Sequence, residues 1–362
     1  MSDNRSYRIS RRTMLVGTAA ALATPAIWGS ARAQARELLV YSWFTNPMQA
    51  IMKDFAAETG AQVNFIGSYS GNPVWWSQMI AGEKWDVFLP SMDWMTRAAL
   101  AERVEPLDLK RIPNFDNLSD SGKSAVEKEL TVNGQVYGLP FALTINALAY
   151  NTNAVEKAKA EANWDVMWDP SFAGRLSTKD EAIIPILTAA ARLDIPTEDI
   201  GAWTPTQYDA LKASLLEQKK LVRKYWSNHE EMAEMLLTEQ AVAGVWVDGR
   251  ARQQASSGNP IGIAVPPQGV PAVIDTMAIL KDAPNKDMAY EFINFILRPE
   301  QMVKIPDIHG AVVMSDKANA LIPGEKKASF VIEPSWKYHW RRFTTPEVSQ
   351  RLERLWTEVK LA

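Results

Sequence analysis

Short apolar runs alternate with amphipathic segments from residue 37 onward. Residues 37–43 are apolar and β-prone, which predicts a buried strand. From Met48 to Phe55 the apolar side chains recur at intervals of three and four, the spacing of one helix face. Residues 61–66 alternate apolar and polar positions and 85–89 form another apolar run, so both predict strands. This β-α-β order predicts an α/β fold with a parallel sheet.

The second half of the chain has the same organisation. The apolar runs 241–247, 261–265 and 276–280 predict strands, and 287–297 predicts a helix with one apolar face. No repeat of solenoid period and no long linker interrupts them. Ligands of open parallel sheets bind beyond the carboxyl ends of the strands. We therefore look for a site first in the loops that follow the first three strands, 42–45, 67–73 and 90–94.

The first 35 residues resemble an export signal. Two adjacent arginines, Arg11 and Arg12, precede a short apolar run at 14–26, and alanines spaced by one residue follow. Paired arginines point to twin-arginine (Tat) export in bacteria, with cleavage after Ala33 or Ala35. The apolar run is too short to span a membrane, and no cysteine follows it to carry a lipid. We expect a protein exported to the periplasm and soluble there.

Composition and charge exclude several classes of protein. The 362 residues are 47% hydrophobic and 22% charged, as in ordinary globular proteins. The formal charge is −3, and because residues 1–35 carry five Arg and one Asp, their removal would leave −7. An acidic chain is not expected to bind nucleic acid. The absence of cysteine excludes disulfides and thiolate metal sites.

Motifs of catalysis and metal binding are not found. The chain has no P-loop, no G-x-G-x-x-G and no H-E-x-x-H. His229, His309 and His339 are too far apart to form a metal-binding motif. The stretch 67–71 has Tyr69 where the G-x-S-x-G motif needs its serine nucleophile. We expect no enzyme, no cofactor and no metal; an enzyme and a metal or cofactor sensor are the alternative classes.

Several segments, in consistent order and spacing, resemble one family over nearly the whole chain after residue 36. The matching segments are LVYSW at 39–43, FAAETG at 55–60, WDVFLPS at 85–91, YGLP at 137–140, NWDVMW at 163–168, FAGR at 172–175, IDTMAI at 274–279 and NKDMAYEFINFILRPE at 285–300. The segment 285–300 is the most specific of them. The family that these segments resemble is the periplasmic solute-binding proteins of ABC importers, of the spermidine/putrescine-binding type.

The resemblance implies a fold and a function. The fold is the periplasmic-binding-protein fold, with two α/β lobes, a hinge of crossing strands and a ligand cleft between the lobes. The function is to bind a small amine-containing solute, a polyamine or related organic cation, and to deliver it to an ABC permease in the inner membrane. The expected partners are the solute, the permease and the Tat machinery, with the chain itself a monomer. The implied divisions are 1–35 for the signal, 36–141 plus 274–312 for lobe 1, and 142–273 plus 313–362 for lobe 2.

The resemblance also implies site residues. Members of this family hold a polyamine with stacked aromatic rings and carboxylates, because ring faces attract cations and carboxylates accept ammonium hydrogen bonds. Trp43, Asp180 and Asp275 match such positions. Asp93 stands where an aromatic residue is usual, and Trp94 follows it.

Further along the chain the match is less regular. Trp246 is adjacent to a family tryptophan position, and the turn at Asp248 leads to Arg250. Lys337 falls near a position that the family fills with a neutral residue. The nine expected ligand-binding residues are thus Trp43, Asp93, Trp94, Asp180, Trp246, Asp248, Arg250, Asp275 and Lys337.

Departures from the family pattern leave the charge of the solute open. Ile183 replaces a carboxylate and Val273 replaces a tryptophan, which weakens a site for a polycation. Arg250 or Lys337 near the cleft would favour a solute that carries a carboxylate. A polyamine or related cation and an opine or amino-acid-like zwitterion are both consistent with this sequence.

Overall fold

The computed structural model describes residues 36–43, 45–67, 71–305, 311–324 and 336–362. The expected export signal at 1–35 and His309 lie outside these ranges. Among the described residues, no helix is both long and apolar enough to cross a membrane.

The predicted β-α-β start is confirmed. β1 (Glu37–Tyr41) and β2 (Gln62–Gly67) pair in parallel, and α1 (Thr45–Thr59) connects them. β1 also pairs in parallel with β3 (Val87–Phe88), which is shorter than the predicted run 85–89. These strands belong to the first lobe, lobe 1. Its other elements are α2 (Asn72–Ile80), α3 (Met92–Leu100), η1 (Leu109–Arg111), η2 (Pro113–Asn117), α4 (Asp120–Glu129), β4 (Thr131–Val132), β5 (Gln135–Val136), α10 (Lys286–Ile296), α11 (Pro299–Met302) and α13 (Asp316–Ala320).

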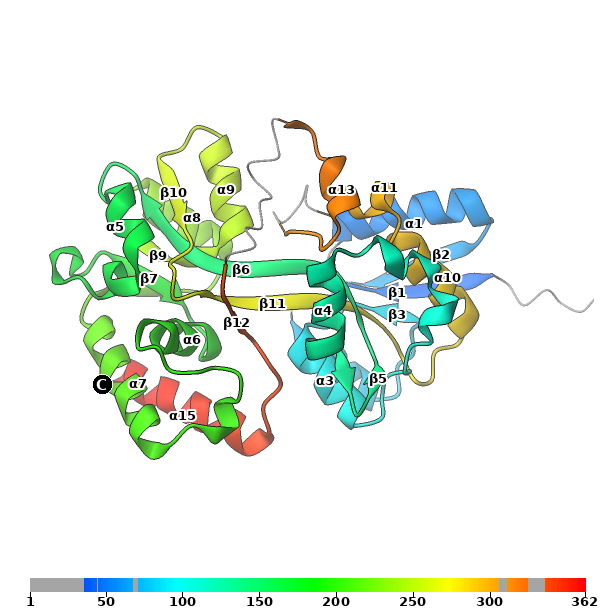
Figure 1. Ribbon diagram of the computed structural model, residues 1–362, viewed down its shortest axis with the longest axis horizontal. Coiled ribbons are helices and arrows are strands. Elements are labelled where there is room, and N and C mark those ends of the chain that lie inside the picture. The colour runs from blue at the N-terminus through cyan, green and yellow to red at the C-terminus, as the bar shows by residue number, and fades with distance from the viewer. Residues whose placement is uncertain (1–35, 44, 68–70, 306–310, 325–335) are drawn as a thin grey trace, which may run out of the picture. The chain divides into compact units, whose positions relative to one another are not determined.

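Two long antiparallel strands connect lobe 1 with the rest of the sheet (Figure 1). β6 (Leu139–Asn151) pairs along its first half with β11 (Val270–Ile279) and along its second half with β9 (Ala243–Val247). β11 reaches β3 at its carboxyl end. The predicted strand 276–280 is thus the last part of a longer strand. The crossing strands implied by the family resemblance are confirmed.

The second lobe, lobe 2, continues the sheet with parallel strands. β7 (Leu176–Lys179) pairs in parallel with both β9 and β8 (Val222–Trp226), and β10 (Ile261–Ala264) pairs antiparallel with β6. The strand order is β2-β1-β3-β11-β6-β9-β7-β8. The other elements of lobe 2 are α5 (Lys157–Ala162), η3 (Trp164–Trp168), η4 (Pro170–Phe172), α6 (Ile183–Arg192), η5 (Ile200–Ala202), α7 (Pro205–Lys219), α8 (His229–Leu237), α9 (Asp248–Ser256), β12 (Tyr338–Trp340) and α15 (Pro346–Leu361).

One stretch does not lie where the predicted lobe boundaries put it. We expected 313–362 in lobe 2, but the amide of Ser119 donates to the carbonyl oxygen of Met314 at 2.9 Å and the Ser315 hydroxyl donates to the carbonyl oxygen of Asn117. α13 also contacts α11 (Figure 1). Residues 313–320 therefore pack on lobe 1, and the chain joins lobe 2 only after them.

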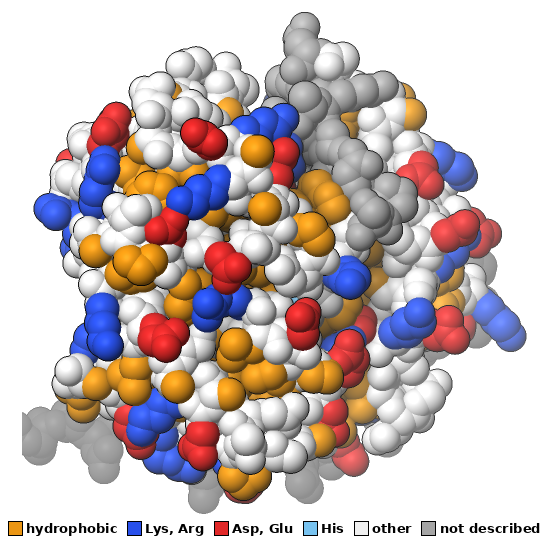
Figure 2. Space-filling model, turned by 60° about the vertical axis from the view of Figure 1, so that its left-hand side comes forward, with side chains coloured by type: hydrophobic (Ala, Val, Ile, Leu, Met, Phe, Trp, Pro, Cys, Tyr) orange, Lys and Arg blue, Asp and Glu red, His pale blue; other side chains and the backbone are white. Residues whose placement is uncertain are grey.

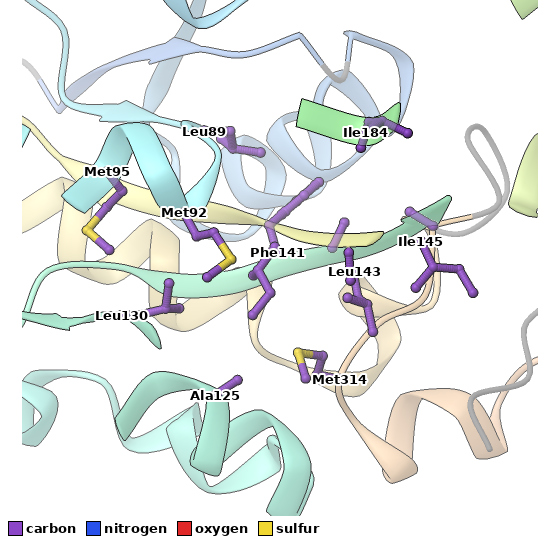
Figure 3. Close-up of a cluster of buried hydrophobic side chains, with 14 of the residues drawn as sticks. Leu89, Met92, Met95, Ala125, Leu130, Phe141, Leu143, Ile145, Ile184 and Met314 are labelled. Atoms are coloured by element: carbon purple, nitrogen blue, oxygen red, sulfur yellow. The ribbon is translucent and has the colours of Figure 1, made fainter. Parts of the chain in front are cut away.

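Buried side chains on both sides of the crossing strands hold the elements in place. Met92 and Met95 of α3 lie on one side of β6, and Leu130 and Met314 lie on the other (Figure 3). Phe141 of β6 is 1% exposed between them. Burial of side chains this large stabilises the fold by about 2 kcal/mol each. The start of the crossing strands is therefore a rigid part of the molecule.

Charged side chains of both signs are interspersed on the face seen in Figure 2. No continuous basic surface appears on that face, which agrees with the small formal charge of −3. Interspersed charges of this kind suit solubility rather than attraction of a polyanion.

The C-terminal strap, residues 336–345, runs beside the crossing strands. β12 within it pairs in parallel with β11. Gly269 has a φ of +101°, and a Cβ atom there would lie 2.9 Å from the carbonyl oxygen of Lys337, so only glycine fits this approach. The two ring nitrogens of His339 lie 2.8 Å from the Thr197 hydroxyl and 2.8 Å from the Gln268 carbonyl oxygen. These contacts fix the position of the strap.

Candidate ligand-binding site

A cavity of about 620 Å³ lies where both lobes, the crossing strands and the C-terminal strap meet. We call it the cleft. All three loops expected from the sheet topology contribute to one wall. The first contributes Trp43, the second contributes residues 71–73, and the third contributes Ser91, Asp93 and Trp94. Its lining residues are Trp43, Gly71, Asn72, Pro73, Ser91, Asp93, Trp94, Arg97, Thr144, Lys179, Glu181, Ala182, Ile183, Val273, Asp275, Arg341, Arg342, Thr344, Ser349, Leu352 and Glu353.

The structure brings four of the expected site residues together in the cleft: Trp43, Asp93, Trp94 and Asp275. Trp43 follows β1, while Asp93 and Trp94 begin α3, directly after the strand end at β3. Asp275 lies on β11 at an irregular register and forms an isolated β-bridge with Ser91. All four come from the lobe 1 side and the crossing strands.

Asp180 lies beside the cleft rather than in its lining. Its carboxylate accepts a hydrogen bond from Lys360 at 2.7 Å and another from the Trp356 indole at 3.3 Å. The next residue, Glu181, lines the cleft instead. Both residues lie in the bend that follows β7, and this bend gives the two carboxylates different surroundings.

Trp246 and Asp248 are buried in lobe 2, away from the cleft lining. Trp246 is 1% exposed in a separate hydrophobic cluster, and its indole N–H donates to Nδ1 of His229 at 3.0 Å. Asp248 forms an ion pair with Arg252, which lies one helical turn later. Oδ2 of Asp248 is 3.3 Å from Nε of Arg252. Burial raises the pKa of Asp248 to about 6, against the opposing charge of Arg252. Both side chains have partners within their own lobe.

Arg250 and Lys337 also lie outside the cleft lining. Arg250 lines a separate pocket of about 370 Å³ between α8 and α9, together with His229 and Glu230. Lys337 is in the C-terminal strap, and its carbonyl oxygen accepts the amide of Val270 at 3.0 Å. The cations that face the cleft are therefore different residues from those expected.

Arg341 stands at the centre of the charged groups of the cleft. Its Nε donates to Oδ2 of Asp93 at 3.0 Å, and its Nη1 lies 3.8 Å from Oε1 of Glu181. Lys179 pairs with the same Glu181 at 3.0 Å. Burial alone would raise the pKa of Glu181, yet Arg341 and Lys179 hold that pKa below its ordinary value. One guanidinium thus joins a carboxylate of lobe 1 to a carboxylate of lobe 2.

Asp275 has no such close partner. It is 5% exposed, and no described residue donates a hydrogen bond to its carboxyl group. Burial raises its pKa to about 8; the charge of Arg341 opposes this rise and that of Asp93 adds to it. Without a bound cation, this carboxyl group therefore keeps its proton at neutral pH.

Aromatic rings form a second compartment next to the charged groups. A cavity of about 520 Å³ adjoins the cleft and is lined by Trp76, Trp94, Arg97, Leu100 and Phe343 among others. The Arg97 guanidinium lies over both indoles, 4.3 Å from the ring centre of Trp76 and 4.7 Å from that of Trp94. No carboxylate of the described residues pairs with Arg97.

The described residues include no group of three or more His, Asp or Glu side chains arranged to hold a metal ion. The carboxylates of the cleft are instead suited to ammonium hydrogen bonds, and its indoles to stacking.

Residues 50–324 match the model of the bacterial extracellular solute-binding proteins, which is more than half of the chain. The chain belongs to this family. Its relatives include the putrescine-binding periplasmic protein PotF of Escherichia coli strain K12, which is 24% identical over 348 residues, or 92% of this chain and 93% of the relative.

Solved structures share the fold of this solute-binding protein. The spermidine/putrescine ABC transporter substrate-binding protein PotD of Streptococcus pneumoniae superposes with a TM-score of 0.76 at 21% identity, over 90% of this chain and 98% of the other. The Atu4243-GABA receptor superposes with a TM-score of 0.70 at 17% identity, over 90% of this chain and 96% of the other. Their two-lobe architecture agrees with the lobes and crossing strands described above.

The sequence-based expectations missed six charged residues that line this solute-binding protein's cleft: Arg97, Lys179, Glu181, Arg341, Arg342 and Glu353. Glu181 could have been found from its place next to Asp180, which the family resemblance singled out. Arg341 had no local signal, because its place depends on the pairing of β12 with β11, some 70 residues earlier in the chain.

Proposed function

We propose that this protein is the substrate-binding component of an ABC importer and binds a small amine-containing solute, a polyamine or a related organic cation, in the cleft. The observation that carries the proposal is the meeting of three carboxyl groups from Asp93, Glu181 and Asp275 beside the indoles of Trp43 and Trp94. Carboxylates accept ammonium hydrogen bonds, and indole faces attract the same cations.

The position of these groups suggests how binding closes the lobes. Asp93 belongs to lobe 1 and Glu181 to lobe 2, so a solute cation that binds beside Asp275 attracts both walls of the cleft. The crossing strands β6 and β11 act as the hinge, and motion there needs no covalent chemistry. The closed form then docks on the permease. In this proposal the protein binds its solute without converting it.

An opine or amino-acid-like zwitterion is the second candidate solute. Arg341 and Arg97 favour it, since each guanidinium could donate hydrogen bonds to a carboxylate of the solute while Asp275 or Glu181 binds the amine. The earlier expectation assigned this role to Arg250 and Lys337, which do not line the cleft.

We further propose export by the twin-arginine route, action in the periplasm and a monomeric state. The paired arginines Arg11 and Arg12 support the route, and the periplasmic names of relatives such as PotF support the compartment.

A thermal-shift screen of the purified protein tests the proposed solute class. The panel contains polyamines, amino acids, betaines and opines. A solute at 100 times its Kd should add about 2.7 kcal/mol of stability, which raises the melting temperature visibly. If no amine in the panel raises the melting temperature, the proposal is wrong.

A further inference from the structure

We propose that Arg341 permanently occupies one of the cation positions of the cleft, so that the solute brings a single ammonium group to the carboxylate cluster. This inference rests on the proposed function, that the cleft binds an amine. It distinguishes amine-containing solutes that place one ammonium group in the cleft, which should bind, from those that place two, which should bind less tightly.

The position of Arg341 is built into the fold. Its guanidinium lies between Asp93 and Glu181, at 3.0 and 3.8 Å, which is where a bound ammonium would meet carboxylates from both lobes. Its side chain is 25% exposed, so the guanidinium is largely removed from water. The strap that carries it is held by β12 and by both ring nitrogens of His339. The guanidinium is therefore a tethered group rather than a mobile surface side chain.

A count of charges shows what Arg341 leaves for the solute. The cluster has three carboxyl groups, on Asp93, Glu181 and Asp275, and two cations, on Lys179 and Arg341. One negative charge remains when all are ionised, and one ammonium balances it. A second ammonium in the same cluster would lie beside like charges, which lowers affinity by about tenfold or more.

Other charged groups around the cleft do not change this count. Arg342 is already paired through Nε with Glu129 of α4 at 2.7 Å. Glu353 of α15 and Arg97 of α3 also line the cleft, and their charges of opposite sign cancel in the count.

The second compartment indicates what the other end of the solute is. That compartment adjoins the cleft at Trp94 and contains Arg97, which no described carboxylate neutralises. A positively charged end there would face another guanidinium. An uncharged or anionic end would meet indole faces and an arginine, so the geometry favours a solute with one amine and a neutral or carboxylate tail.

Three probes with the same four-carbon frame test this inference: 1-aminobutane, 4-aminobutanoate and 1,4-diaminobutane. They carry the same first ammonium, and their second ends are neutral, negative and positive. Isothermal titration calorimetry would measure their affinities for the wild type, Arg341→Gln, Arg341→Lys and Arg298→Gln. Arg298 is a matched control, because it forms a two-bond ion pair with Glu58 on lobe 1, outside the cleft lining.

The wild type should bind at least one of the one-ammonium probes about tenfold tighter than the diamine. Arg341→Gln should shift the ratio of affinities toward the diamine by about tenfold or more. Arg341→Lys should keep the wild-type order because it keeps the charge, and Arg298→Gln should also keep it.

Two results would overturn the inference: a wild type that prefers the diamine, or an Arg341→Gln variant whose affinities for all three probes change by the same factor. Failure of all three probes to bind any form of the protein would overturn the amine site itself, and the inference with it. The two kinds of failure are therefore distinct.

Discussion

Asp275 and Asp248 are both buried carboxyl groups at 5% and 2% exposure, yet their surroundings differ in one decisive respect. Asp248 has Arg252 one helical turn along, within its own helix, and backbone amides also donate to it. Asp275 has no donor among the described residues and feels Arg341 only through its charge. The first carboxyl group is neutralised by its own helix, whereas the second is left for a ligand. Burial alone therefore does not identify a binding carboxylate; the absence of a local partner does.

The largest expected effect concerns stability as a function of pH. The folded chain keeps the Asp275 proton up to its raised pKa of about 8, whereas the unfolded chain releases it near the ordinary value of 3.8. Stability should therefore fall as pH rises between these values, by roughly 3 kcal/mol from pH 5 to 8, and level off above. Asp275→Asn should lack this part of the slope. Urea unfolding of both proteins across this pH range measures the difference.

Asp248, with a raised pKa, and His339, with a pKa that burial lowers, also contribute to the pH dependence, but they are present in both proteins and cancel from the difference. If stability depended on pH with the same slope in the wild type and in Asp275→Asn, then Asp275 would have partners that balance its charge as those of Asp248 do. The contrast between the two carboxyl groups would then be wrong.

Substitutions of Asp275 and Asp248 should also differ in their effect on solute affinity. For the solute that gives the largest thermal shift, Asp275→Asn should weaken binding by about 100-fold, because it removes a buried charge that pairs with the ammonium. Asp248→Asn should leave affinity unchanged, since its carboxylate does not line the cleft. Calorimetric titration measures both. Comparable losses in the two variants would contradict the distinction.

The local partner of Asp248 should matter to stability and not to binding. Arg252→Met leaves the carboxylate buried without its ion pair and should destabilise the protein by about 2 kcal/mol at neutral pH. Arg252→Lys, which keeps the charge, should lose less. Chemical unfolding gives the stabilities, and a titration with the solute should show unchanged affinity. A large loss of affinity in Arg252→Met would mean that loss of the Asp248–Arg252 ion pair disturbs the cleft from within lobe 2.

The smallest effect concerns the rings. Trp94→Leu should weaken solute binding by about fivefold, the size of one cation–π contact of about 1 kcal/mol. Phe172→Leu removes a half-buried ring of lobe 2 that also lies under a cation, Lys159, but does not line the cleft, and it should bind as the wild type does. Equal losses in these two variants would assign the effect to general packing instead of ring stacking.

The sequence alone could predict much of the fold, and four of the nine expected site residues lie in the cleft lining. Strand ends and the family resemblance led to Trp43, Asp93, Trp94 and Asp275, because loops after parallel strands meet at one edge of a sheet. The assignment of Asp180 was one residue away from Glu181, because the bend that follows β7 brings the second of these carboxylates, and not the first, into the cleft lining.

Long-range packing explains the remaining differences. Trp246 is adjacent to a family tryptophan position, but its indole completes a hydrophobic cluster and donates a hydrogen bond to His229. Arg341 reaches the cleft only because residues 338–340 pair with a strand 68 residues earlier, and no local pattern encodes such a pairing.

The hydrogen bonding of β6 has a mechanical consequence. Its 13 residues are bonded to β11 in one half and to β9 in the other, so the lobes cannot slide past each other without breaking the ladder. What remains soft is the bending and twisting of a narrow antiparallel ribbon, which changes few hydrogen bonds. The connection therefore resists sliding of the lobes but allows them to bend and twist relative to each other. Small forces between charged groups on the two walls can move the lobes through these few soft motions.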